Sequence, residues 1–368
     1  MKTDRLASLD VFRGITIAGM ILVNNPGNWS FVYAPLRHAK WHGWTPTDLI
    51  FPFFLFIVGV SITFSFSKKI KNGAISSALY SKILRRAILL FAVGYFLRVF
   101  PSFNFESIRI PGVLHRIALC YLFASLLFLK VRPKGRVAFT LFLLAGYWAV
   151  MKLVPVPGYG AGVLDFEGNL CSFIDMKLLA GHLYKATFDP EGILSTFPAV
   201  ATALLGTLTG DWLLSKRGQR SKVLGLFAAG IIFVFLGLFL HPLFPINKQL
   251  WTSTFVIFTA GAALIVLGLC YGINDILGQK KWAYPFLVFG TNAIAVYVGS
   301  TLMVKLVALI HVSVQGGEAM LLRSFIYNKL LVPWTGPLNG SLLYPIILLL
   351  IWFAILFPLY RKKIFIKI

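Results

Sequence analysis

Residues 49–66 read LIFPFFLFIVGVSITFSF, an apolar run without a charged side chain. An α-helix needs about 20 mostly apolar residues to cross the hydrocarbon core of a bilayer. Barrel strands alternate in polarity and are only about 10 residues long, so the sequence predicts an all-α membrane bundle of about ten transmembrane helices. The predicted spans lie at 8–24, 48–67, 83–101, 113–129, 138–154, 193–214, 223–240, 251–273, 283–310 and 341–360.

The composition excludes a soluble enzyme. AVILMFWYC residues make up 58% of the 368 residues, charged residues only 13%, and the mean hydropathy is +0.81. Soluble domains are typically about 45–50% apolar and 25% charged, so one soluble core cannot bury this much apolar surface. We expect a single transmembrane domain over residues 1–368.

The net charge of +23 reflects membrane orientation. In a soluble protein it would suggest nucleic acid, but 22 of the 35 basic residues fall on one side if every run crosses. The positive-inside rule makes that side cytoplasmic, with both termini inside, and no nucleic-acid partner is expected. These residues are Lys2, Arg5, Lys68, Lys69, Lys71, Lys82, Arg85, Arg86, Lys130, Arg132, Lys134, Arg136, Lys216, Arg217, Arg220, Lys222, Lys280, Lys281, Arg361, Lys362, Lys363 and Lys367. The connections predicted to face outward are 25–47, 102–112, 155–192, 241–250 and 311–340.

The first outer connection holds a set of polar residues suited to acyl transfer. His38 has the residue type of a general base near neutral pH, Asp48 can orient an imidazole, and Asn24 can donate to a developing oxyanion. Structural alternatives stay open, because Asp48 can instead cap a helix. Asn24 can instead end the first span beside Pro26 and Gly27.

Two further sets lie on the predicted outer face. Trp41 and His42 belong to WHGW, a pattern typical of the aromatic belt at a membrane interface, and we also consider them for substrate binding. Asp189 and Glu191 precede the span at 193–214, where acids are ordinary at a helix start. Two carboxylates on the outer face are also suited to holding a cationic amine.

Several polar residues lie at the ends of spans, where ionisable groups are costly and often functional. Asp10 and Arg13 are three residues apart, which favours an ion pair on one helix or a phosphate-binding role for Arg13. Arg116 lies one turn inside its span and needs an acid or a ligand as partner. Asn247 and Lys248 enter the span at 251–273.

Other patterns indicate structure rather than chemistry. The run GTLTG at 206–210 is a small-xxx-small pattern that allows close helix packing. Asn292, inside the span at 283–310, is the kind of residue that forms hydrogen bonds across helices. The sequence has no Walker A, GxGxxG, HExxH or GxSxG motif and no cysteine–histidine spacing typical of zinc, so no metal is expected.

Several strings together resemble a known family. They include SLDVFRG at 8–14, MILVN at 20–24, HAKWHGWTPTDLIFPFFLFIVG at 38–59, RIPGVLHRIALCY at 109–121, DPEGILSTFPA at 189–199, INKQLWTSTFV at 246–256 and TNAIAVYV at 291–298. In this order they resemble the catalytic domain of heparan-α-glucosaminide N-acetyltransferase and its bacterial relatives over nearly the whole chain. One departure is His115, where relatives often have glutamine.

The resemblance implies a transmembrane enzyme that moves an acetyl group from cytosolic acetyl-CoA to a glucosamine amine on the far side of the membrane. The family's active-site histidine carries over to His38, its asparagine to Asn24 and its aspartate to Asp48. We assign the remaining candidates to coenzyme binding (Arg13, Arg116, Asn247 and Lys248) and to substrate binding (Trp41, His42, Asp189 and Glu191). The mechanism stays open, with His38 as general base or as a covalent acetyl carrier.

The implied location is the bacterial inner membrane, with lipid around the bundle, and family analogy favours a homodimer. The alternative function is an amino-sugar transporter without acyl transfer. Transporters are expected to show inverted repeats and paired broken helices at the midplane, and the sequence indicates neither. A purely structural membrane scaffold would leave Asn24, His38 and Asp48 without convergent geometry.

Overall fold

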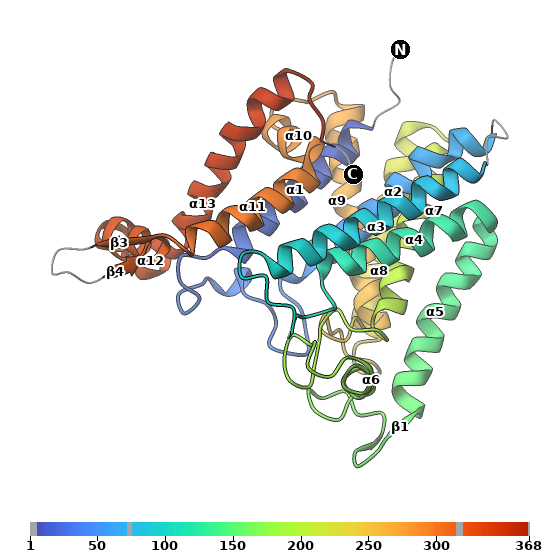
Figure 1. Cartoon of the computed structure of the whole chain (residues 1–368). Helices are drawn as coiled ribbons and strands as arrows, with labels where there is room; N and C mark the ends of the chain where they lie inside the picture. Colours follow the sequence, from blue (N-terminus) through green and yellow to red (C-terminus); the bar gives the residue numbers. More distant parts are fainter. Residues whose placement is uncertain (1–5, 72–75, 107, 314–318, 367–368) are drawn as a thin grey trace. The chain divides into compact units, whose positions relative to one another are not determined.

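The computed structural model describes residues 6–71, 76–106, 108–313 and 319–366 (Figure 1). Most of these residues are helical, so the predicted all-α polytopic bundle is confirmed. The longer helices are α1 (Ala7–Asn24), α2 (Ile50–Lys71), α3 (Ser77–Val99), α4 (Val113–Lys130), α5 (Pro133–Leu153), α6 (Leu170–Leu179), α7 (Thr196–Leu214), α8 (Gln219–Phe239), α9 (Ser253–Tyr271), α10 (Tyr284–Thr291), α11 (Ala293–Val307) and α13 (Val332–Arg361). Lys2, Arg5 and Lys367, and the side chains of Lys68 and Lys71, lie outside the described residues.

Short elements connect these helices. Two are 3₁₀ turns, η1 (Ala34–Leu36) and η2 (Pro46–Leu49), and two are π turns, η3 (Gly272–Ile276) and η4 (Ile326–Leu331). The four-residue helix α12 (Leu322–Phe325) precedes η4. Two small antiparallel hairpins pair β1 (Pro155–Val156) with β2 (Gly160–Ala161), and β3 (His311–Ser313) with β4 (Ala319–Leu321).

The described residues account for all ten predicted apolar runs. Eight helices within them are long and apolar enough to cross a bilayer, and nine if α10 and α11 form one bent span. The remaining predicted run, 83–101, corresponds to α3, which has 23 residues. Its bases, Lys82, Arg85, Arg86 and Arg98, make it too polar to meet the same criterion.

The span predicted at 283–310 is broken in the structure. α10 and α11 are bent by 82° at Asn292, whose backbone is not helical. The Asn292 amide group donates to the carbonyl of Ile364 (3.2 Å), and its side-chain oxygen accepts from the backbone N–H of Ile366 (2.8 Å). Asn292 was predicted to form hydrogen bonds across helices; its partners instead lie in the non-helical segment that follows α13, so it joins the break to that segment.

The outer connection predicted at 311–340 is shorter than expected. Helical structure begins at Leu322 and continues through η4 into α13. Gly336 interrupts α13 with a φ of 76°, a left-handed conformation that glycine adopts without steric cost. Pro337 follows directly, so the chain changes direction here before the last apolar run begins.

The contacts divide the chain into two compact units. Unit 1 comprises Met1–His38, Thr45–Ile50 and Ile273–Ile368, and unit 2 comprises Ala39–Trp44 and Phe51–Gly272. Unit 1 therefore holds α1 and α10 to α13, and unit 2 holds α3 to α9 and nearly all of α2. The single domain expected over residues 1–368 stays a prediction.

In unit 1, α1 and α10 touch through their backbones (Figure 1). A Cβ atom added to Gly14 would lie 1.8 Å from the carbonyl oxygen of Phe286, and one added to Gly290 would lie 1.9 Å from that of Asp10. Glycine is required at both positions, because any side chain would separate the helices. This is the close packing that small residues allow in membranes.

In unit 2, glycines hold α2 against α7. A Cβ atom on Gly59 would lie 1.9 Å from the carbonyl oxygen of Ala203, and one on Gly206 would lie 2.1 Å from that of Phe56. A Cβ atom on Gly210 would lie 2.5 Å from the Cβ atom of Thr63. The prediction that GTLTG allows close helix packing is confirmed.

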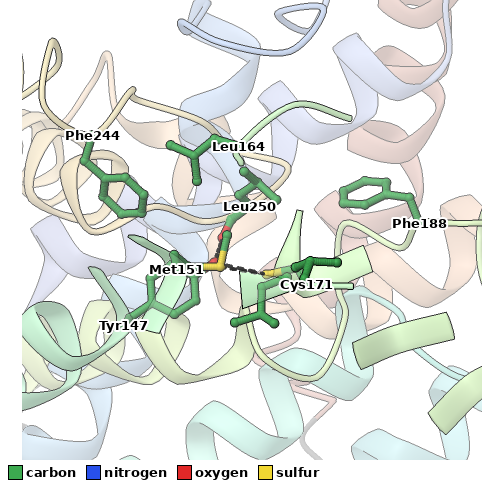
Figure 2. Packing of buried hydrophobic residues seen from close by; sticks show 9 residues of the cluster. Tyr147, Met151, Leu164, Cys171, Phe188, Phe244 and Leu250 are labelled. Carbon is green, nitrogen blue, oxygen red and sulfur yellow. Dashed lines mark hydrogen bonds between the residues drawn. The ribbon is translucent and has the colours of Figure 1, made fainter. Parts of the chain in front are cut away.

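A separate apolar core in unit 2 secures the long connection between α5 and α7 (Figure 2). Tyr147 and Met151 of α5 pack there with Cys171 of α6, whose thiol lies 3.8 Å from the Met151 sulfur. The Tyr147 hydroxyl donates to the carbonyl of Leu250 at 2.5 Å. Phe188 and Phe244 also belong to this core, so it positions the polar residues that follow in the chain.

Replacing Gly206 with alanine tests the helix contact. We expect Gly206→Ala to lower the free energy of unfolding by about 1–3 kcal/mol, because overpacking forces the helices apart. Gly146→Ala on α5 is the matched control, since an added Cβ there meets no atom within 4 Å. Thermal unfolding in detergent, followed by tryptophan fluorescence, measures both. Equal melting temperatures for the two variants would contradict the α2–α7 contact.

Candidate active site

His38 and Asp48 form a direct pair in unit 1. The distance from His38 Nδ1 to Asp48 Oδ1 is 2.6 Å. The Asp48 side chain is 1% exposed, whereas that of His38 is 40% exposed. The structure therefore brings these two sequence-predicted residues together, with the acid buried and the imidazole accessible.

The sequence TPTD at 45–48 explains where the carboxylate lies. Thr45 is the N-cap of η2 and Pro46 its first residue, and Asp48 completes a capping box with Thr45. Asp48 Oδ2 accepts from the Thr45 backbone N–H at 3.0 Å and from its hydroxyl at 3.1 Å. The cap and the histidine contact, considered above as alternatives, thus use different oxygens of one carboxylate.

This geometry determines which ring nitrogen of His38 is basic. A proton on Nδ1 is stabilised by Asp48, so Nε2 becomes the nitrogen that accepts a proton or forms a bond. The buried carboxylate also stabilises the imidazolium that forms when Nε2 takes up a proton. The pair is suited to general-base catalysis and equally to nucleophilic catalysis at Nε2.

Asn24 is the last residue of α1 and is exposed. Its side chain forms no hydrogen bond with any described residue, so its predicted oxyanion role stays a prediction. α1 ends at Asn24, and Asn25 is its C-cap, with an amide group that donates to the carbonyl of Ile21 at 2.8 Å.

The loop between Asn24 and His38 is held by residues that the sequence reasoning missed. Arg323 Nη2 donates to the carbonyl of Pro26 at 2.5 Å. Ser341 of α13 accepts from the backbone N–H groups of Gly27 (2.9 Å, through its carbonyl) and Asn28 (3.1 Å, through its hydroxyl). One sequence signal could have identified Arg323, because it is a basic residue in a connection predicted to face outward.

In unit 2, the structure brings together two residues that were predicted separately. The Asn247 amide nitrogen lies 3.2 Å from His42 Nδ1, and burial lowers the pKa of His42 below its ordinary value. Asn247 is fully buried, and its side-chain oxygen accepts from the Leu250 backbone N–H at 2.8 Å. Lys248, the other predicted coenzyme residue of this segment, is half-buried.

Trp41 belongs to the apolar core of unit 2. Its indole N–H donates to the carbonyl of Leu164 at 2.8 Å. Its ring packs edge-on against Phe166 and Phe188, with centroid distances of 5.3 and 5.4 Å. These contacts give Trp41 a structural role, and its predicted substrate contact stays a prediction.

The two acids predicted to hold an amine are paired with an arginine. Arg109 Nε and Nη2 donate to the two carboxylate oxygens of Asp189 at 2.6 and 2.5 Å, and Arg109 also contacts Glu191. The Asp189 side chain is fully buried. Sequence reasoning did not identify Arg109 as the partner, because 80 residues separate it from Asp189. Arg109 neutralises negative charge on these carboxylates that would otherwise attract an ammonium group. The predicted role of Asp189 and Glu191 in substrate binding stays a prediction.

The predicted coenzyme arginines lie in different units. Arg13 forms the ion pair with Asp10 that its spacing favoured, at 2.6 Å, and also donates to the carbonyl of Gly290 at 3.4 Å. Arg116 is 1% exposed, and its Nη2 donates to the Ser195 hydroxyl at 2.5 Å. The described residues include no cluster of three or more His, Cys, Asp or Glu side chains that would hold a metal ion.

Comparison with known proteins identifies the family that the quoted strings resemble. Residues 5–244 match the family model described as heparan-alpha-glucosaminide N-acetyltransferase, catalytic. The human protein named heparan-alpha-glucosaminide N-acetyltransferase is 32% identical over 311 residues, which cover 68% of this chain and 46% of the human protein. The mouse protein of the same name is 30% identical over 314 residues, covering 69% of this chain and 47% of its own length. The chain thus matches about half the length of these relatives, and it belongs to the heparan-alpha-glucosaminide N-acetyltransferase catalytic family.

Proposed function

We propose that this chain is a transmembrane N-acetyltransferase that moves the acetyl group of acetyl-CoA to the amine of a glucosamine-type sugar. The observation that carries the proposal is the contact between His38 and the buried carboxylate of Asp48. Family membership supports the reaction class, because both curated relatives are named as N-acetyltransferases of a glucosaminide.

In the direct route, His38 Nε2 removes a proton from the amine as the amine nitrogen attacks the thioester carbonyl. The new C–N bond forms, the C–S bond breaks, and CoA leaves as a thiolate that recovers a proton from the His38 imidazolium. Asp48 stabilises that imidazolium, and Asn24 donates a hydrogen bond to the oxyanion. Removing one preorganised donor of this kind typically lowers kcat by about 100- to 1,000-fold.

In the covalent route, His38 Nε2 attacks the thioester first. An acetyl-imidazolium forms as the C–S bond breaks and CoA leaves as a thiolate. The amine nitrogen then attacks the acetyl carbon, the bond from that carbon to Nε2 breaks, and the CoA thiolate takes up the proton that the amine loses. Asp48 serves both routes, because it holds the proton on Nδ1 and directs Nε2 to the reaction.

The donor and acceptor are proposed to approach from opposite sides of the membrane. Acetyl-CoA enters from the cytoplasm, and no metal takes part. Its proposed ligands are considered within each unit by itself: Arg13 in unit 1, and Asn247 with Lys248 in unit 2. The sugar lies on the outer face of a bacterial inner membrane, with Trp41 and His42 as its proposed contacts. Both chain termini are cytoplasmic in this arrangement, and a homodimer in lipid is the proposed assembly.

One structural observation favours the alternative function, an amino-sugar transporter without acyl transfer. The break between α10 and α11 has the form of a discontinuous helix, which transporters use at their binding sites. A transporter does not need His38 for chemistry, so His38→Ala would leave sugar uptake into vesicles unchanged. The acetyltransferase proposal expects acetyl transfer to be lost in that variant.

The carboxylate of Asp48 is tested by Asp48→Asn. We expect kcat to fall by about 100- to 10,000-fold, because asparagine favours the wrong tautomer of the imidazole. Both KM values should change little, since Asp48 does not contact substrate in the proposed mechanism. Glu106→Gln is the control, because Glu106 is an exposed acid of another connection. Wild-type kcat in Asp48→Asn would contradict the proposed role.

The covalent route is tested by a single turnover with labelled acetyl-CoA and no acceptor. Any label retained on the protein is expected on His38 and absent from His38→Ala, because His38 Nε2 is the proposed nucleophile. Peptide mass spectrometry after rapid quenching locates the label. Label on any other residue would contradict His38 as the acetyl carrier.

A further inference from the structure

Two threonine hydroxyls attach the turn η2 to the chain just before His38. The Thr45 hydroxyl donates to the carbonyl of Arg37 at 2.6 Å, and the Thr47 hydroxyl donates to the carbonyl of Pro35 at 3.1 Å. All of these residues belong to unit 1. The segment that leads into His38 is therefore held by side chains of the turn that also carries the catalytic carboxylate.

Thr45 links the two partners of the proposed catalytic pair. Its backbone N–H donates to Asp48 Oδ2 at 3.0 Å, and its hydroxyl oxygen lies 3.1 Å from the same carboxylate oxygen. The same hydroxyl holds the carbonyl of Arg37, which forms the peptide bond to His38. A hydroxyl carries one hydrogen, and the shorter distance, 2.6 Å, makes the Arg37 carbonyl its main acceptor.

The carboxylate of Asp48 has contacts that do not require the Thr45 side chain. Its Oδ2 accepts from the Thr45 backbone N–H, and the Asp48 backbone N–H donates to the Thr45 carbonyl at 2.9 Å. Both contacts remain when another side chain replaces threonine. The distinct contribution of the hydroxyl is therefore to the position of the chain before His38.

The position of His38 benefits from such a contact. Its side chain is 40% exposed, whereas that of Asp48 is 1% exposed, so packing restrains the acid more than the imidazole. Arg37 is the C-cap of η1 and has an extended backbone (φ −87°, ψ 153°), and its N–H makes the last hydrogen bond of that turn. Its carbonyl is thus available to Thr45. A displacement of about 1 Å in a catalytic geometry can lower the rate about 100-fold.

We propose that Thr45 is a positioning residue for acetyl transfer. Its hydroxyl holds the Arg37 carbonyl and thereby keeps His38 Nδ1 within hydrogen-bond distance of Asp48. This inference rests on the proposed function, because that function gives His38 its reaction. Thr45 contacts neither substrate in the mechanism and acts only through His38.

The test compares Thr45→Val with wild type in acetyl transfer to glucosamine by the full chain in detergent. Valine has nearly the shape of threonine without its hydroxyl, so we expect kcat to fall by about 10- to 100-fold as His38 loses its alignment. The KM values for acetyl-CoA and glucosamine should stay unchanged, because Thr45 binds neither. A wild-type kcat, or a raised KM with an unchanged kcat, overturns the proposal.

Thr45→Ser keeps the hydroxyl and is expected to recover most of the lost kcat. Thr301→Val is the matched control, because the half-buried Thr301 of α11 donates its hydroxyl to a carbonyl of its own helix, that of Tyr297, at 2.8 Å. It should keep the wild-type kcat. A loss in Thr45→Ser or in Thr301→Val equal to that in Thr45→Val overturns the proposal.

Stability is controlled separately, because valine is a poorer residue than threonine at the start of a helical turn. Each variant is assayed well below its own melting temperature, so that a lost cap does not reduce the folded fraction. If Thr45→Val does not fold, Thr45→Ala replaces it, with the same expected fall in kcat and the same outcomes against it.

A spectroscopic measurement separates this inference from the proposed function. Solid-state NMR of protein with ¹⁵N-labelled histidine reports which ring nitrogen carries the proton, and His38→Ala identifies the signals of His38. The contact with Asp48 favours the proton on Nδ1, so wild type is expected to show mainly this tautomer. Thr45→Val should show a larger share of the tautomer with the proton on Nε2.

The two failures are then distinguishable. If wild type acetylates no sugar, the proposed function fails, and the ¹⁵N signals of His38 decide the positioning role alone. A tautomer shift in Thr45→Val that is absent from Thr45→Ser and Thr301→Val supports it. Identical His38 signals in wild type and Thr45→Val overturn it.

Discussion

A charge inside a membrane protein needs a partner, and this constraint accounts for much of the structure. Hydrocarbon offers no hydrogen bonds, so buried polar groups must be satisfied within the protein. Arg13 is paired with Asp10, Arg136 with Asp211, and Arg109 with Asp189. The pair for which we propose chemistry differs from these, because its acid, Asp48, is buried whereas its partner, His38, is exposed.

Asp48 shows how one buried carboxylate serves both stability and the proposed reaction. Its Oδ2 closes the capping box of η2 and its Oδ1 contacts His38. Because the turn fixes the carboxylate, the imidazole is oriented without a contribution from the substrate. Preorganisation of this kind accounts for much of the rate enhancement of many enzymes. The loop that carries His38 is fixed in turn by Arg323 and Ser341.

The sequence predicted features that depend on local pattern. Long apolar runs located the helices, the spacing of Asp10 and Arg13 predicted their ion pair, and TPTD predicted a cap at Asp48. It did not predict contacts that depend on tertiary structure, such as the ion pair of Arg109 with Asp189. The break at Asn292 was missed because hydropathy averages over a span, so one polar residue held by a distant backbone segment leaves an apolar run unchanged.

The central claim is that His38, oriented by Asp48, carries out acetyl transfer from acetyl-CoA to an amino sugar. The most direct measurement is the formation of labelled N-acetylglucosamine from labelled acetyl-CoA and glucosamine by the purified chain. The account predicts multiple turnovers for wild type, and background levels for a His38→Ala variant that keeps the wild-type melting temperature. Equal product from both proteins, or none from wild type, would contradict it.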